Sequence, residues 1–249
     1  MSGQMATSLP FPRPESSGVR QLLSPVAMAL SEFLGVARPV KEQRRNALHA
    51  RVIVLWVTAV IVLRWGGAAV GSGQGCQVTD VDARILATLN ALRQPWLDAF
   101  FAAVTWLGSI VVLLPAALAL AWRLQQRGQG RAALLPPSAV GGAWALAHLG
   151  KVLIERPRPD LFPAVIAMPA DPSFPSAHAM QVTAFTLAWL LVPHQRAGWT
   201  QIVAVATLAL LVAISRLYLQ VHFPSDVWIG MLVATAWVFG LWLALMGRA

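Results

Sequence analysis

Long uncharged stretches are the feature that most limits what this chain can fold into. A bilayer core of about 30 Å is crossed by roughly 20 mainly apolar residues in a helix. The clearest stretches of about this length without Asp, Glu, Lys or Arg are residues 99–122, 132–150 and 227–246. Because 57% of the 249 residues are hydrophobic and only 12% are charged, the chain has the composition of a polytopic membrane protein rather than of a soluble domain.

Three further stretches complete the predicted membrane region. Residues 179–192 and 199–214 are shorter, but each reaches spanning length if its helix continues into neighbouring loop residues. The first stretch, 52–63, ends at Arg64, whose long side chain would extend toward an interface beside Trp65. We therefore predict an all-α fold with about six transmembrane helices.

Residues 80–94 are predicted to form an additional, amphipathic helix. Its apolar residues recur at helical spacing, and its charged residues fall elsewhere on the helical wheel. The apolar set is Val81, Ile85, Leu89 and Leu92, and the charged set includes Asp82, Arg84 and Arg93. This pattern favours a helix lying in the membrane interface, with a surface helix packed on a neighbour as the alternative.

The N-terminal part differs from the rest of the chain. Its first 20 residues are rich in Pro and Ser and lack the apolar core of a cleaved signal peptide. We interpret residues 1–50 as a partly disordered cytoplasmic segment and residues 51–249 as a membrane-embedded domain. With six spans and the N-terminus inside, 12 of the 19 basic residues lie on the inner side and seven on the outer side, as the positive-inside rule expects.

Composition also limits the possible partners. The net charge of +9 is scattered between apolar stretches and forms no contiguous basic stripe, so a nucleic-acid partner is not expected. An anionic membrane surface and anionic head groups account for this charge better. Cys76 is the only cysteine, which excludes an intramolecular disulfide and a cysteine-based metal site; no metal or other cofactor is expected.

Three short polar clusters interrupt the apolar background. They are Lys151 with Arg158 and Pro159, then Pro175, Ser176, Ala177 and His178, and finally Ser215, Arg216, His222 and Asp226. Charge inside or beside apolar spans is costly and therefore marks functional candidates. The predicted topology brings all three clusters to the same outer face of the membrane, so that residues distant in sequence can form one site.

The residue types in these clusters suit phosphate chemistry. Lys151, Arg158 and Arg216 can supply fixed cations for phosphate oxygens, and arginine can donate two hydrogen bonds at once. The Ser176 hydroxyl and the amides that follow it precede a predicted span, where a helix N-terminus favours anions.

The two histidines of the clusters differ in their neighbours. Asp226 follows His222 by four positions and shares a helix face with it if the segment is helical. The carboxylate would keep one ring nitrogen protonated and leave the other free to attack phosphorus. His178 would protonate the leaving oxygen and then activate water.

Each residue alone also has a simpler interpretation. A histidine or a basic residue at a span end is usually an interfacial anchor, and a serine before a helix is usually an N-cap. We favour such an interfacial role for His148 and a lipid head-group contact for Arg156. The spacing and the common membrane face of the cluster residues, however, are not explained by separate anchors.

The spacing of the clusters resembles the three-part signature of the type 2 phosphatidic acid phosphatase superfamily. Six residues separate Lys151 from Arg158, Pro175–His178 follows, and five residues separate Arg216 from His222. The resemblance covers about residues 80–246. Ala177 departs from the signature, because the family usually has Gly there, and its methyl group restricts the backbone.

The resemblance implies a metal-independent phosphatase with a helical-bundle core and a phosphohistidine on His222, assisted by Asp226, with His178 as general acid. The implied phosphate-binding groups are Lys151, Arg158, Ser176, Arg216 and the amide of Ala177. We expect a multi-pass inner-membrane enzyme whose site faces the exterior and whose substrate is a lipid phosphate in the bilayer. Undecaprenyl diphosphate is the favoured substrate, ahead of phosphatidylglycerol phosphate and phosphatidate. A non-hydrolytic transporter or binder of anionic lipids, or a protein like the vanadate-dependent haloperoxidases, is the alternative.

Overall fold

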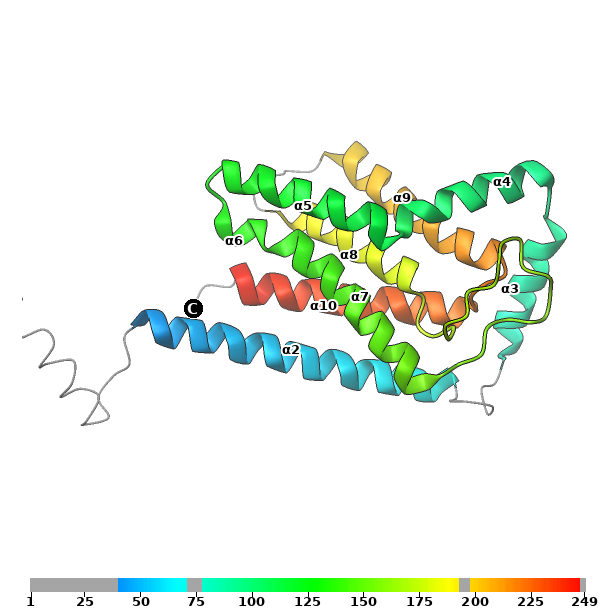
Figure 1. The fold of residues 1–249 in the computed structure, drawn as a ribbon, viewed down its shortest axis with the longest axis horizontal. Helices are drawn as coiled ribbons and strands as arrows, with labels where there is room; N and C mark the ends of the chain where they lie inside the picture. Colours follow the sequence, from blue (N-terminus) through cyan, green and yellow to red (C-terminus); the bar gives the residue numbers. More distant parts are fainter. Residues whose placement is uncertain (1–39, 71–77, 193–197, 247–249) are drawn as a thin grey trace, which may run out of the picture. The chain divides into compact units, whose positions relative to one another are not determined.

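The structure is a computed structural model that describes residues 40–70, 78–192 and 198–246. The chain divides into two units, Met1–Ala47 and Leu48–Ala249, and the description below concerns the second. All regular secondary structure in the described residues is helical (Figure 1). The segments are α2 (Val40–Val70), α3 (Asp80–Ala91), α4 (Pro95–Val104), the 3₁₀ turn η2 (Thr105–Gly108), α5 (Ile110–Gln126), α6 (Gly130–Ala133), α7 (Leu135–Ile154), α8 (Ala177–Leu191), α9 (Trp199–Tyr218) and α10 (Pro224–Met246).

Helix α8 packs against α5, α7, α9 and α10, so it forms the centre of this bundle. Many core side chains are small, including Ala139, Ala143 and Ala147 of α7 and Ala184 and Ala188 of α8. Small residues let membrane helices approach closely where apolar side chains gain little from leaving lipid. The small side chains at the α7–α8 contact therefore let the backbones of these two helices approach each other closely.

The described part of the chain confirms an all-α membrane protein. Three helices, containing residues 50–68, 199–218 and 224–246, are long and apolar enough to cross a bilayer, and the bent pair 95–108 and 110–126 makes a fourth candidate. Large apolar side chains such as Trp122, Leu232 and Leu243 are exposed on the outside of the bundle, as expected of lipid-facing surfaces. The count of six spans stays a prediction, as do the domain boundary near residue 50 and the orientation in the membrane.

The stretch 99–122 is not the single continuous helix that its apolar run predicts. It bends by 45° between η2 and α5. Ser109 ends η2 by donating both its amide (3.0 Å) and its hydroxyl (2.7 Å) to the carbonyl of Trp106. The stretch stays a candidate span, and its apolar composition gives no sign of the bend, because this local hydrogen bonding does not change that composition.

Helix α3 begins where the amphipathic pattern predicts it, with the Thr79 hydroxyl accepting from the Asp82 amide at 3.0 Å as N-cap. Its buried face contains Leu86 together with Asp82, whereas Val81 is 63% and Leu92 is 56% exposed. The helix packs on α9 and α10, as the alternative interpretation expected. The assignment of Asp82 to the outward polar face was wrong, because a buried arginine pairs with it.

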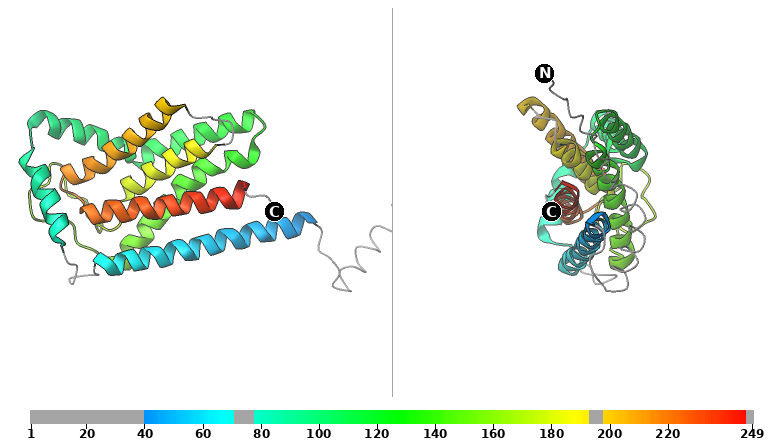
Figure 2. Two further views of the ribbon diagram at one scale, coloured as in Figure 1. Left: turned by 180° about the vertical axis from the view of Figure 1, so that it is seen from behind. Right: turned by 90° about the vertical axis from the view of Figure 1, so that its left-hand side faces the viewer.

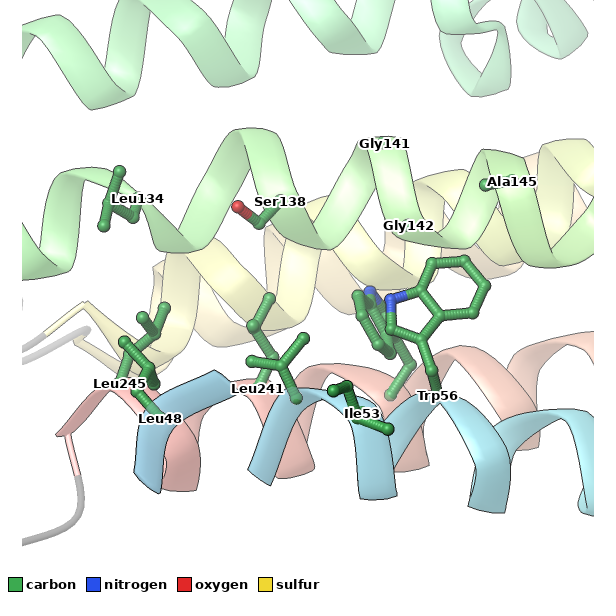
Figure 3. A pocket seen from close by; sticks show the side chains of 12 residues that line it. Leu48, Ile53, Trp56, Leu134, Ser138, Gly141, Gly142, Ala145, Leu241 and Leu245 are labelled. Carbon is green, nitrogen blue, oxygen red and sulfur yellow. The ribbon is translucent and has the colours of Figure 1, made fainter. Parts of the chain in front are cut away.

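Two views show the end of the bundle at which the residues of the three polar clusters lie, called the functional end below. The C-terminal ends of α7 and α9, the N-terminal ends of α8 and α10, and the loop 155–176 gather there beside α3 (Figures 1 and 2). Toward the other end, α2, α7 and α10 border an apolar cavity of about 720 Å³ that is lined by Trp56, Ser138 and Leu241, among others (Figure 3). The indole of Trp237 lies over Gly142, where a Cβ atom would be 2.2 Å from the ring.

Candidate active site

One cavity of about 260 Å³ lies at the functional end of the bundle. Six of the eight residues that the sequence singled out line it: Lys151, Arg158, Ala177, His178, Arg216 and His222. They come from the last turn of α7, the loop after it, the first turn of α8, the last turn of α9 and the segment before α10. The helix ends therefore bring together residues that are up to 71 positions apart, from 151 to 222.

Asp171 connects two of the three cavity cations. Its carboxylate lies 3.1 Å from the Lys151 ammonium and 2.7 Å from the Arg158 guanidinium, and Arg158 Nε also donates to the Asp171 carbonyl at 2.8 Å. Partial burial opposes ionisation, but Lys151 and Arg158 outweigh it and lower the pKa of Asp171 to about 2. Sequence reasoning missed Asp171, whose only signal was a carboxylate in a loop between two clusters.

The third cavity cation, Arg216, is held by a residue of the bent stretch. Its Nη1 donates to the Thr105 hydroxyl at 2.6 Å, and the side chain is buried. Thr105 belongs to η2, just before the bend, so this part of the broken span gives the guanidinium a polar partner.

The two ring nitrogens of His222 lie in different surroundings. Nε2 lies 3.3 Å from Arg158 Nη1, on the side of the cavity cations. Nδ1 lies 3.4 Å from the Ser173 hydroxyl and 3.6 Å from Asp226 Oδ2. Burial, followed by the charges of Arg216 and Arg158, lowers the pKa of His222 well below its usual value. The imidazole is therefore neutral at pH 7, with its Nδ1 edge toward the carboxylate.

Asp226 is fully buried behind His222. It accepts hydrogen bonds from the Ser173 hydroxyl, the Arg156 guanidinium and, at 3.0 Å, the Phe223 amide. Helix α10 begins at Pro224, so His222 precedes the helix and does not share a regular helical face with Asp226. The two side chains still meet, because the turn at Phe223 folds back onto the carboxylate.

Arg156 is not the lipid head-group contact that its position predicted. Its side chain is 0% exposed and forms ion pairs with Asp226 and with Asp82 of α3. A basic residue next to a helix end looks the same in the sequence whether it faces lipid or protein. The buried pairing depends on residues 70 and 74 positions away, which local patterns do not reveal.

Ser176 and Ala177 form the start of α8. The Ser176 amide donates to the Asp226 carbonyl at 3.2 Å, and its buried hydroxyl has no partner among the described residues. Ser176 is the N-cap residue of α8, as the simpler interpretation expected, but its hydroxyl makes no capping hydrogen bond to the helix. Ala177 lines the cavity, at the helix end where the first amides lack intrahelical acceptors.

His148 lies on the rim of the same cavity rather than only at an interface. It is exposed, its Nδ1 lies 2.9 Å from the Trp144 carbonyl, and its ring contacts the Trp144 ring in a tilted arrangement with the ring centroids 4.3 Å apart. His194 and the side chain of His49 lie outside the described residues.

The arrangement combines three cations, a neutral imidazole with a carboxylate behind it, and a second imidazole in one small cavity. Fixed cations favour a group that carries two or more negative charges, and a supported imidazole can act as a nucleophile. A phosphoryl group meets both requirements.

Comparisons with known proteins agree with this chemistry. The family model described as the PAP2 superfamily matches residues 132–248. Phosphatidylglycerophosphatase B of Bacillus subtilis is 33% identical over 157 residues, which cover 60% of this chain and 76% of that protein. Decaprenylphosphoryl-5-phosphoribose phosphatase of Mycobacterium tuberculosis is 43% identical over 91 residues, covering 35% of this chain and 47% of that protein. The chain thus matches about half of the mycobacterial protein.

Two solved structures are similar in fold. The transmembrane PAP2 type phosphatidylglycerolphosphate phosphatase from Bacillus subtilis aligns with a TM-score of 0.61 at 28% identity, over 77% of this chain and 94% of that one. Aquifex aeolicus LpxE aligns with a TM-score of 0.53 over 66% of this chain and 96% of that one. At 21% identity, the latter is evidence for the fold alone.

Proposed function

Because this chain belongs to the PAP2 superfamily and is a membrane lipid phosphatase, we propose that it hydrolyses a lipid phosphate through a phosphohistidine on His222. The observation that carries this proposal is the placement of His222, with Nδ1 toward Ser173 and Asp226 and Nε2 toward Arg158. This placement leaves Nε2 as the attacking atom.

In the first step, His222 Nε2 attacks phosphorus and the bond from phosphorus to the lipid oxygen breaks. His178 gives its proton to that oxygen, so that the lipid leaves as an alcohol, or as a monophosphate if the substrate is a diphosphate. The ring of His222 becomes positively charged when Nε2 is phosphorylated and Nδ1 keeps its proton. The carboxylate of Asp226 offsets this charge.

In the second step, His178 takes a proton from water while the water oxygen attacks phosphorus. The bond from phosphorus to Nε2 breaks, inorganic phosphate forms and His222 is again neutral. Lys151, Arg158 and Arg216 hold the phosphate oxygens in both steps, together with the Ser176 hydroxyl and the Ala177 amide. The unpartnered hydroxyl of Ser176 supports its part in this set.

For the substrate, we propose a phosphate on a lipid whose chain stays in the bilayer. The activities for which the relatives are named favour phosphatidylglycerol phosphate first and a polyprenyl-linked phosphate second, with undecaprenyl diphosphate and phosphatidate as further candidates. The distribution of basic residues supports a site on the exterior face of the inner membrane. Such a site takes the head group from the membrane surface without extracting the lipid.

The test is a phosphate-release assay on the purified full-length protein in detergent with EDTA, across phosphatidylglycerol phosphate, undecaprenyl diphosphate, phosphatidate and a lipid A analogue. The chain's own cations offset the phosphate charge, so release is expected with EDTA present. His222→Ala should abolish release, whereas His49→Ala, a histidine before all three clusters, should not. An acid-labile, alkali-stable phosphoprotein should be trapped from the wild type alone. Release that strictly requires Mg²⁺, or persists in His222→Ala, contradicts the mechanism.

A further inference from the structure

Arg156 lies buried between two carboxylates from helices that are far apart in the sequence, Asp82 of α3 and Asp226 of α10. Its Nη2 lies 3.2 Å from Asp82 Oδ2 of α3, its Nη1 donates to Asp226 Oδ1 of α10, and all three side chains are at most 2% exposed. The guanidinium also lies over the Phe223 ring, 4.2 Å from its centroid. A single cation thus connects α3 to the carboxylate behind His222.

Ser225 closes this assembly from the first turn of α10. Its amide donates to Asp82 Oδ1 at 2.9 Å and its hydroxyl donates to Asp82 Oδ2 at 2.8 Å. Arg156 Nη1 in turn donates to the Ser225 hydroxyl at 2.8 Å. Both carboxylate oxygens of Asp82 therefore accept hydrogen bonds. These bonds fix the orientation of the Arg156 guanidinium, which also donates to Asp226.

The charge of the assembly matters as much as its geometry. Arg156 carries one positive charge, and Asp82 and Asp226 carry one negative charge each when ionised. If Arg156 paired with Asp226 alone, the pair would be neutral and would offer little support to a positively charged imidazole. With both carboxylates ionised, the assembly of Arg156, Asp82 and Asp226 carries one net negative charge beside His222. Buried charges interact strongly at such distances.

We propose that Asp82 is a positioning residue for the reaction: through Arg156 it orients Asp226 behind His222 and keeps the carboxylate assembly anionic while the ring carries phosphate. This inference rests on the proposed function of His222. Asp82 lies outside residues 132–248, which match the family model, and it does not line the phosphate cavity. It acts on phosphoryl transfer rather than on phosphate binding.

The test compares Asp82→Asn with Asp80→Asn, which removes an exposed carboxylate two positions away on the same helix. Asp82→Asn should lower kcat on the order of 10²-fold, because small displacements of a supporting group cost about this much. KM and the inhibition constant of inorganic phosphate should stay within about twofold, because phosphate-binding groups outside the assembly are unchanged. Asp80→Asn should match the wild type in all three. Equal kcat values for the two variants overturn the inference.

A double-mutant cycle separates positioning from general damage. In the Asp226→Asn background, Asp82→Asn should cause no further loss of kcat, because its effect passes through Asp226. If the losses of kcat in the Asp82→Asn and Asp226→Asn variants multiply in the double variant, the inference is overturned. If Asp82→Asn does not fold, Ser225→Ala, which keeps the backbone donor to Asp82, should lower kcat about fivefold; unchanged kcat there also overturns it.

The outcomes also distinguish this inference from the proposed function. If His222→Ala abolishes release while Asp82→Asn leaves kcat unchanged, only the role of Asp82 fails. If His222→Ala retains release, the phosphohistidine mechanism fails first, and the role of Asp82 in it falls as well.

Discussion

His222 Nδ1 lies 3.6 Å from Asp226 Oδ2, beyond normal hydrogen-bond length. The Ser173 hydroxyl fills the gap, 3.4 Å from Nδ1 and donating to the same carboxylate oxygen. The support of the imidazole by the carboxylate therefore includes a serine that precedes the Pro-Ser-Ala-His cluster.

Ser173→Ala should lower kcat about fivefold, because one net hydrogen bond at a buried group contributes on the order of 1 kcal/mol. KM should change little, since Ser173 does not line the cavity. Ser138→Ala, at the apolar cavity far from the site, is the matched control and should behave as the wild type. Steady-state kinetics of phosphate release gives both parameters. An unchanged kcat in Ser173→Ala would show that His222 and Asp226 interact directly during turnover.

The pH dependence of kcat/KM should reflect the neutral state of His222. Burial and the nearby arginines lower its pKa, so the nucleophile stays unprotonated at pH values where an ordinary histidine is charged. On the acidic side, the limb of the profile that reports protonation of His222 should therefore lie below the usual histidine pKa of about 6.5. An acidic limb at or above pH 7 in the wild type would contradict the assignment of His222 as the neutral nucleophile.

Asp171→Asn should raise KM about tenfold while kcat changes less, because Lys151 and Arg158 lose the carboxylate that holds them together. Hydrogen bonds to charged groups contribute on the order of 1.5–3 kcal/mol before solvent screening. Asp160→Asn removes an exposed carboxylate from the same loop and should leave KM unchanged.

The same carboxylate makes a prediction about acid stability. Since its folded pKa is lowered to about 2, below the ordinary value of about 3.9, its contribution to stability is complete above that ordinary value. The contribution is lost as pH falls through about 2. Thermal unfolding of the wild type and Asp171→Asn should differ by a constant amount from pH 5 to 8, and the difference should shrink below pH 4.

Gly108→Ala tests the packing that holds His178. A Cβ atom at this position would lie 2.5 Å from Val212 Cγ1 and 3.2 Å from His178 Cβ. Overpacking of this kind typically costs about 1–3 kcal/mol, and the adjustment would displace the first turn of α8. We expect a lower melting temperature together with a lower kcat. Gly141→Ala is the control, because open space surrounds its position.

The parts of the fold and site that follow from the sequence are those set by local patterns. Helices α8, α9 and α10 begin within three residues of the predicted stretches 179–192, 199–214 and 227–246, since polar clusters and turn residues border each of them. Most of the cluster residues indeed line one cavity, because helices that end on one side of a membrane bring their ends together. Their catalytic roles stay predictions.

The parts that did not follow from the sequence depend on contacts between distant residues. Asp82 looked like a member of a polar helix face, and Arg156 looked like a lipid anchor. The role of each residue becomes visible only in the structure, where Arg156 forms ion pairs with both Asp82 and Asp226. The bend at Ser109 was hidden for a related reason: the run 99–122 stays apolar on both sides of it.

The site's position where helices end also affects what happens after the reaction. Once the phosphorus–oxygen bond has broken, the lipid product remains in the hydrocarbon phase, whereas inorganic phosphate dissolves in water. The two products therefore partition into different solvents and rarely meet again. Dilution of phosphate into the aqueous phase makes resynthesis of the ester improbable, so the proposed position of the site at the membrane surface would favour turnover in one direction.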